Sequence, residues 1–262
     1  MTEYMIDFFM SWFANPSLLG IGLAIIFGAV WLVAYWPPLL RRPWLWAVFP
    51  IGAMLGLLAV SFIQIPLQIL VGQALGQFWS QEVLIAWLLL AGIPQILLSG
   101  IVQEGAKLVP VVLWWWGEDR KLEPKMGLVV GAVAGAGFGI FEAMWAHNAI
   151  FAAGWTWQAV QSGGYMALAG FWERFFTVAF HTASCALAGW GLARGWGWQF
   201  YLLAAFLHSL LNYSIIFLQV GLFTVLHVEI FAAVMAVLLT AAVLWLRWRQ
   251  EGAAADVEPG TS

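Results

Sequence analysis

The sequence predicts an all-α fold, a polytopic bundle of transmembrane helices. Of its 262 residues, 63% are hydrophobic and only 9% are charged, a composition far from that of soluble globular domains. The 19 tryptophans favour anchoring at membrane interfaces as well as packing. Eight of the ten Lys and Arg residues fall in four short places between or just after long apolar runs, which is the pattern of cytoplasmic loops under the positive-inside rule.

The apolar runs and the basic places together give the direction of the chain. A transmembrane helix needs about 20 mostly apolar residues. Seven runs meet this length, approximately at 18–36, 47–71, 94–116, 126–148, 172–193, 198–218 and 225–246. The basic places are Arg41-Arg42, the group Arg120, Lys121 and Lys125, Arg194, and Arg247 with Arg249. If all four basic places lie on the cytoplasmic side, seven spans place the N-terminus on the non-cytoplasmic side and the C-terminus in the cytoplasm, and this is the orientation we expect.

The stretch 83–116 decides the number of spans. It is longer than one span and contains Pro94, which breaks or kinks a helix. We therefore expect 83–93 to form an interfacial or re-entrant helix ahead of the true span 94–116. If 83–93 spans separately, there are eight spans and the basic places no longer share one side.

No linker divides the chain, so we expect residues 1–249 to form a single transmembrane domain. Residues 250–262 are small and acidic and are predicted to be a disordered cytoplasmic tail. Within the fourth span, glycine recurs every four residues, at Gly127, Gly131, Gly135 and Gly139. Such a stripe without side chains lets another helix backbone approach closely.

Two charged residues lie near the middle of the third span. Glu104 and Lys107 are three residues apart, so they share a helix face and can pair. A charge at this depth costs at least ~2.5–3.5 kcal/mol on insertion scales. A structural ion pair is one reading, but ionisable residues inside a membrane mark functional sites by default.

Glu142 lies in the outer part of the fourth span and is a candidate site residue. His147 follows it by five residues, about 140° around a helix, so it faces elsewhere and is expected near the membrane interface. His227 and Glu229, at the outer start of the last span, are also expected to be interface residues.

The fifth and sixth spans each carry a histidine near the middle. Arg174 and His181 are seven residues apart on one helix face, and His208 and Asn212 are four apart on another. A lone histidine on an apolar helix is usually a hydrogen-bonded packing residue. Two histidines at matched depth with Glu104 favour a shared site, which we expect to open toward the non-cytoplasmic half.

This group of side chains allows several functions. A carboxylate, two imidazoles, an amide and a lysine suffice for acid–base attack of water on an amide bond. The same set could hold a metal, relay protons in a transporter, or ligate haem through the two histidines. The chain has no basic patch large enough to bind nucleic acid.

Four motifs resemble one family. QEGAK, GFGIFEA, ERFFTVAFH with the following TASCALAGWGLARG, and HSLLN resemble, in this order, the PrsW-type membrane proteases, which are related to YhfC-type, CAAX-processing and bacteriocin-processing membrane peptidases. The similarity covers roughly residues 95–218. It implies intramembrane or juxtamembrane cleavage of a membrane-anchored protein, in the plasma membrane of a prokaryote. It leaves the cofactor open between a divalent metal such as zinc and none.

The resemblance also implies roles for single residues. The family pattern is matched by Glu104, Lys107, Glu142, His181, His208 and Asn212. Gln103 departs from it, because it stands where the first of two adjacent glutamates belongs, and an amide is not a useful proton acceptor. Glu104 or Glu142 must then supply the base; we favour Glu104. His181 and His208 would position water or bind a metal, and Asn212 would donate to the oxyanion.

Gln103, Lys107 and Arg174 are assigned supporting roles. The alternatives to a peptidase are a catalytically degenerate family member that only binds membrane proteins, which Gln103 favours, and a proton- or ion-coupled transporter. The lipid bilayer and a membrane-anchored protein substrate are the expected partners.

Overall fold

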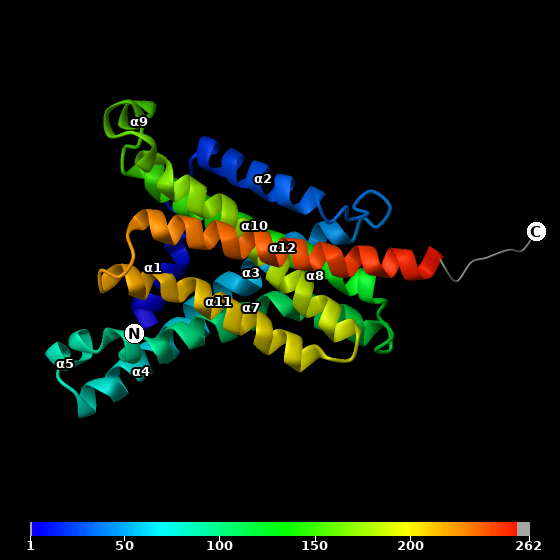
Figure 1. The fold of residues 1–262 in the computed structure, drawn as a ribbon, viewed down its shortest axis with the longest axis horizontal. Coiled ribbons are helices and arrows are strands. Elements are labelled where there is room, and N and C mark those ends of the chain that lie inside the picture. The colour runs from blue at the N-terminus through cyan, green and yellow to red at the C-terminus, as the bar shows by residue number, and fades with distance from the viewer. Residues whose placement is uncertain (1, 256–262) are drawn as a thin grey trace, which may run out of the picture.

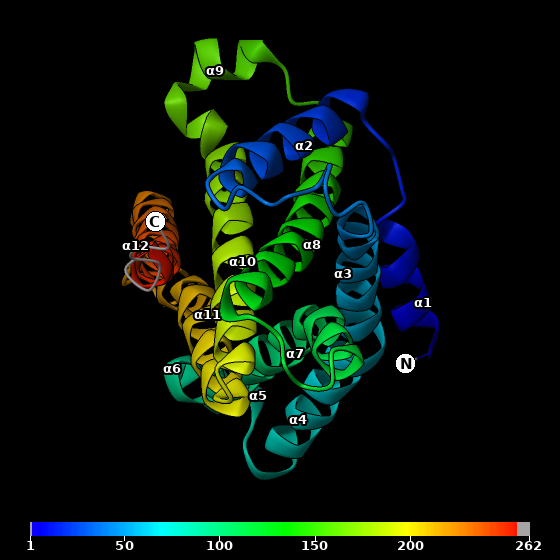
Figure 2. The ribbon, with the colours of Figure 1, turned by 90° about the vertical axis from the view of Figure 1, so that its right-hand side faces the viewer.

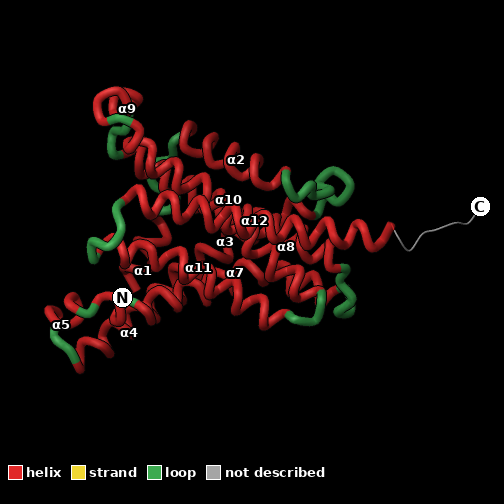
Figure 3. The backbone as a smooth tube through the Cα atoms, viewed as in Figure 1, coloured by secondary structure: helices red, strands yellow, loops and turns green. Residues whose placement is uncertain are grey.

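In the computed structural model, residues 2–255 are described, and they form helices joined by loops, with no strand among them (Figure 3). The elements are α1 (Thr2–Ser11), α2 (Leu18–Val33), α3 (Leu45–Ala59), the π-helical turn η1 (Val60–Gln64), α4 (Ile65–Phe78), α5 (Gln81–Ala86), α6 (Leu88–Ala91), α7 (Ile93–Gly117), α8 (Pro124–Ala152), α9 (Trp157–Gly163), the 3₁₀ turn η2 (Tyr165–Leu168), α10 (Ala169–Ala193), α11 (Gly197–Gln219) and α12 (Val225–Ala255). The all-helical prediction is confirmed.

Six helical segments in the described part of the chain are long and apolar enough to cross a membrane. They are Leu45–Phe78, Leu88–Gly117, Pro124–Ala152, Tyr165–Ala193, Gly197–Gln219 and Val225–Arg249. The first expected span, 18–36, is the shorter apolar helix α2 of 16 residues. At about 1.5 Å per residue it measures about 24 Å, less than the ~30 Å hydrocarbon core.

The helix is interrupted ahead of α7 at Trp87 and Gly92, close to the predicted Pro94, and residues 88–93 belong to the same candidate span as α7. Residues 83–93 fall mostly in the short helices α5 and α6, and Pro94 lies in the first turn of α7. Proline is tolerated there because the first turn has no intrahelical partner for its missing N–H. The stretch therefore forms no separate span in the structure.

All four basic places lie at one end of the bundle (Figure 1). The loops from α2 to α3, from α7 to α8 and from α10 to α11 gather at that end, and the C-terminal part of α12 extends past it. The helix α1, the short helices α5 and α9, and the loop from α11 to α12 lie at the opposite end. Successive long helices from α7 to α12 thus run up and down the bundle.

The glycine stripe brings α8 and α10 into backbone contact at the centre of the bundle (Figure 2). A Cβ added at Gly131 would lie 2.3 Å from the carbonyl oxygen of Cys185, and one at Gly135 would lie 2.1 Å from that of His181. Neither position has room for any side chain. The packing prediction for the stripe is confirmed, and the stripe fixes the depth and rotation of His181 against α8.

The end of α12 overlaps the predicted tail. The helix continues to Ala255, so residues 250–255, which the sequence assigned to a disordered tail, are helical. Residues 256–262 of that tail lie outside the described residues.

Candidate active site

Four helices bring the predicted polar residues together. Glu104 comes from α7, Glu142 from α8, His181 from α10 and His208 from α11. One ligand atom from each of Glu104, His181 and His208 lies within 4.8 Å of the others, and all three residues are buried. The three side chains converge in the interior, as the sequence predicted, but only His181 and His208 line the cavity that the sequence predicted for all three.

The first part of the site is the ion pair predicted within α7. Lys107 Nζ lies 2.5 Å from Glu104 Oε1, and both side chains are fully buried. Ser184 of α10 donates its hydroxyl to the Glu104 carboxylate at 3.1 Å and lies 3.3 Å from Lys107 Nζ. Pairing and hydrogen bonding together compensate the two charges for the loss of water.

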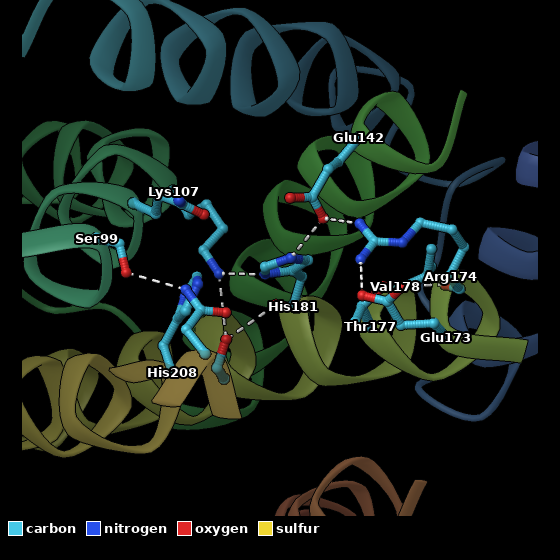
Figure 4. A network of polar contacts seen from close by, with 12 residues as sticks. Ser99, Lys107, Glu142, Glu173, Arg174, Thr177, Val178, His181 and His208 are labelled. Atoms are coloured by element: carbon cyan, nitrogen blue, oxygen red, sulfur yellow. Dashed lines mark hydrogen bonds and ion pairs between the residues drawn. The ribbon is translucent and has the colours of Figure 1, made fainter. Parts of the chain in front are cut away.

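His181 connects this pair to a second carboxylate, and Figure 4 shows it between Lys107 and Glu142. Its Nδ1 lies 2.9 Å from Lys107 Nζ, and its Nε2 lies 3.1 Å from Glu142 Oε2. An ammonium group only donates and a carboxylate only accepts. Nδ1 is therefore the acceptor and Nε2–H the donor, so the contacts hold His181 as one neutral tautomer.

His208 is oriented by the other carboxylate. Its Nδ1 lies 2.7 Å from Glu104 Oε1, and because a carboxylate accepts, Nδ1 carries the proton. The unprotonated Nε2 then remains for water or a metal. A carboxylate behind a histidine is the usual way in which proteins fix the tautomer and direction of an imidazole.

The second ion pair links α8 to the start of α10. Arg174 lies 3.0 Å from Glu142 Oε2 and also pairs with its neighbour Glu173. These side chains are only partly buried, with 20% of the Glu142 side chain exposed against none for Glu104. Glu142 is thus the accessible carboxylate of the site and Glu104 the enclosed one.

A small cavity lies over these groups. Its volume is about 60 Å³, room for roughly two water molecules at about 30 Å³ each. It is lined by Gln103, Glu142, Glu173, Arg174, Thr177, His181, His208, Leu211, Asn212, Ser214, Ile215, Val228 and Ala232. Arg174 lies in the second turn of α10 and Val228 in the first turn of α12, so the cavity lies toward the end of the bundle away from the basic loops.

The amide side chains of Asn212 and Gln103, both predicted in the site, line the cavity, but their hydrogen bonds go to residues that do not line it. Asn212 donates Nδ2 to the Ser99 hydroxyl at 2.9 Å, which leaves its second N–H for another acceptor. Gln103 donates Nε2 to Gln64 Oε1 at 3.0 Å. These two hydrogen bonds go to residues outside the two ion pairs.

The structure also contains polar residues that the sequence did not predict in the site. Ser184 lies three residues after His181, a helical spacing that could have marked it, whereas Ser99 and Gln64 become visible only once the helices are packed. His147, expected near the membrane interface, is fully buried, with Nδ1 3.1 Å from the Gly20 carbonyl oxygen of α2.

The start of α12 differs from expectation in one residue. Glu229 was expected at the membrane interface with His227, but Glu229 is buried and only His227 is exposed. At this end α12 packs against α10, and Trp172 Nε1 of α10 donates to the backbone carbonyl oxygen of Glu229. This burial could not be predicted, because both residues lie at the outer start of the last apolar run and hydropathy does not show which side chains a neighbouring helix covers.

The match to a family of known proteins covers most of the chain. Residues 41–243 match the family model of the PrsW family intramembrane metalloproteases. The chain belongs to this PrsW family. No curated protein and no solved structure matches it at a significant level. The family match extends beyond the four motifs to the helices on both sides of them, and in this PrsW chain Glu142, His181 and His208 line one cavity, with Glu104 enclosed behind His208.

The family name implies a metal, and the buried donors of this PrsW chain fit one. Two imidazoles and a carboxylate are the donor set of many catalytic zinc sites, and Glu104, His181 and His208 form a buried group that could bind a metal. The ammonium group of Lys107 contacts both Glu104 and His181. Lys107 occupies the lone pair of His181 Nδ1 in this arrangement, so a cation would bind His181 only after the Lys107 ammonium group moved away from it.

Proposed function

We propose that this protein is a membrane-embedded peptidase that cleaves a membrane-anchored protein by attack of water on a peptide bond. The observation that carries the proposal is the cavity, which has room for water and is bordered by a partly exposed carboxylate and two imidazoles with fixed tautomers. Family membership supports the reaction class. The reaction needs a base, an oriented water and donors for the oxyanion.

Glu142 is the better candidate for the base, although the sequence alone favoured Glu104. Glu142 lines the cavity, whereas Glu104 does not and is enclosed by Lys107, Ser184 and His208. Both contacts to Glu142 go to Oε2, so Oε1 is the oxygen that faces no described donor. In this proposal Glu104 acts through His208, as a positioning residue.

The proton moves in a closed cycle. Glu142 takes a proton from water as the water oxygen bonds to the carbonyl carbon of the substrate, and the carbonyl oxygen gains negative charge. The second N–H of Asn212 donates to that oxygen, and His208 Nε2 orients the water. When the carbon–nitrogen bond breaks, Glu142 returns the proton to the leaving nitrogen, which restores the site.

A metal held by Glu104, His181 and His208 would polarise the carbonyl and acidify the bound water. Glu104, His181 and His208 would then serve as ligands, whereas Glu142 and Asn212 would keep the tasks described above. Arg174 holds the Glu142 carboxylate in place, and Ser184 and Lys107 hold that of Glu104.

Cleavage of a single-span reporter protein in liposomes tests the proposal. Glu142→Gln keeps the size of the side chain but removes the base, so we expect the cleavage rate to fall about 100-fold or more. Glu118→Gln, at an exposed residue after α7, is the matched control and should cleave at the wild-type rate. Equal rates in the wild type and Glu142→Gln would overturn the assignment of the base.

A second function, binding of membrane proteins without cleavage, is favoured by Gln103, which occupies the position of a family glutamate. The two functions differ in one comparison. A wild type that cleaves no reporter, beside a Gln103→Glu variant that does, would identify a degenerate member. Cleavage by both supports the peptidase.

The orientation in the membrane is part of the proposal. The basic places at one end of the bundle favour that end as cytoplasmic, with the N-terminal end outside and α2 counted as a seventh, shorter span. The cavity then opens toward the non-cytoplasmic side. A prokaryotic plasma membrane is the location that fits the family resemblance.

A further inference from the structure

Four glutamines form a continuous polar line that begins at the cavity and runs between α7 and the helical segment 45–78. Gln103 donates to Gln64 at 3.0 Å, and Gln64 Nε2 lies 3.5 Å from Gln68 Oε1. Gln68 and Gln95 each donate Nε2 to the backbone carbonyl of the other at 2.9 Å. We call these four residues the glutamine track. Side-chain amides between helices in a membrane must find partners within the protein.

One end of the track is left unpartnered, and that end lies at the cavity. Gln103 is 7% exposed, and its Oε1 is fully buried without a hydrogen-bond partner. Among the cavity-lining residues, all of which lie in the described part of the chain, it is the one with such an atom. Buried polar atoms are nearly always hydrogen-bonded in native proteins, so an exception points to an absent partner or a function.

The neighbouring helical segment 45–78, which contacts Gln103 through Gln64, is irregular at the point of contact. Gln64 is the last residue of the π-helical turn η1, which interrupts the helix between α3 and α4. Single π-helical turns recur at functional sites in helices. The irregular turn places the amide of Gln64 against Gln103, and this bond fixes the direction of the Gln103 carboxamide.

We infer that Gln103 is a substrate-positioning residue, whose Oε1 accepts a hydrogen bond from a peptide N–H of the substrate segment at the cavity. This inference rests on the proposed peptidase function. A transmembrane segment must leave its helix before its peptide bond can be attacked, and its freed N–H groups then need acceptors, because lipid offers none. Glu104 Oε1 and Glu142 Oε2 already take two or more contacts each, whereas Gln103 Oε1 takes none.

An amide suits this task better than the family carboxylate. It accepts a hydrogen bond without adding a third negative charge beside Glu104 and Glu142. The departure at position 103 then changes how the substrate is held and leaves the base at Glu142.

Binding of a synthetic peptide and its ester analogues tests the inference. The probe is a Leu/Ala single-span peptide with a central Gly-Gly pair and flanking lysines, and each analogue replaces one central peptide N–H by an ester oxygen. Kd is measured with the full-length protein in lipid nanodiscs. We expect the wild type to bind the amide about three- to tenfold more tightly than one of the esters, the effect of one hydrogen bond.

Variants of the track separate this role from a structural one. Gln103→Met removes the acceptor and should bind amide and ester equally, whereas Gln103→Glu keeps an acceptor and should retain the preference. Gln64→Met should weaken the preference by releasing Gln103. The control, Gln219→Met at the exposed end of α11, should behave as wild type, and size-exclusion profiles confirm that each variant is folded.

Two results would overturn the inference. One is a wild type that fails to bind the probe or binds amide and ester equally, and the other is an unchanged preference in Gln103→Met. Binding is measured without cleavage, so failure of the peptidase proposal gives a different result: the preference for the amide persists while no reporter is cut.

Discussion

At the scale of single residues, the site consists of two ion pairs joined by one imidazole. Glu104 with Lys107 is enclosed, and Glu142 with Arg174 faces the cavity. His181 contacts a member of each pair. Two carboxylates in different surroundings can take different tasks, and here enclosure favours positioning for one and proton transfer for the other.

The ion pair in α7 should be strongly coupled. Removing one partner of a buried pair leaves an uncompensated charge, so Lys107→Ala should lower the free energy of unfolding by about 3–5 kcal/mol. The double variant Lys107→Ala/Glu104→Gln should lose about 1–3 kcal/mol less free energy of unfolding than the sum of the losses in the two single variants. Unfolding in detergent measures all three variants, with Lys121→Ala in the exposed α7–α8 loop as control. Strictly additive losses would show that the two residues act independently.

The donor group predicts the metal content of the purified protein. If Glu104, His181 and His208 hold zinc, His181→Ala and His208→Ala should each lose it, because two protein ligands rarely suffice for a catalytic zinc site. His227→Ala, which alters an exposed histidine, should keep the wild-type content. Elemental analysis by mass spectrometry gives the stoichiometry. A metal-free wild type that still cleaves its reporter would rule out this use of the donor group.

At the scale of elements, the pairing of α8 with α10 sets the geometry of the site. The glycine stripe allows backbone contact, and the same contact brings Glu142 of α8 to His181 of α10. Depth within each helix could be predicted from the sequence, which is why the convergence of Glu104, His181 and His208 was expected. The contact of Glu142 with Arg174 depends on helix rotation, which spacing along one helix does not give.

The stripe gives a direct prediction for packing. Gly135→Ala places a methyl group against the His181 carbonyl oxygen, so it should lower the free energy of unfolding by about 1–3 kcal/mol and reduce cleavage by displacing His181. Gly22→Ala is the control, since nothing lies within 4 Å of its added Cβ and alanine favours the helix. Melting curves in detergent compare the two. Equal stability would mean that α8 and α10 can separate at no cost.

Other parts of the site required the packed structure. The enclosure of Glu104 and the partial exposure of Glu142 come from neighbouring helices, so the sequence could not show that Glu142 lines the cavity and Glu104 does not. The burial of His147 and of Glu229 was missed for the same reason, because a neighbouring helix packs on each: α2 contacts His147 and α10 contacts Glu229. Charge and hydropathy predict how deep a residue lies in the membrane, but they do not predict which neighbouring helix covers its side chain.

At the scale of the whole molecule, the basic places share one end and the cavity lies toward the other. The positive-inside rule then predicts a cytoplasmic α7–α8 loop and a cytoplasmic C-terminus. Cysteine tags in both places should be shielded in intact cells from a reagent that does not cross membranes. Labelling of one tag but not the other would contradict the prediction that the loop and the C-terminus lie on the same side of the membrane. A tag ahead of α1, which should be labelled, serves as the control.

The most direct test of the central claim is peptide-bond hydrolysis itself. Proteoliposomes with a single-span substrate are incubated in oxygen-18 water, and mass spectrometry examines the new carboxyl terminus. The proposed reaction predicts that wild type produces a terminus carrying oxygen-18, and that Glu142→Gln produces at most about one-hundredth as much. A new terminus without the label, or equal product from Glu142→Gln, would contradict attack by water activated at Glu142.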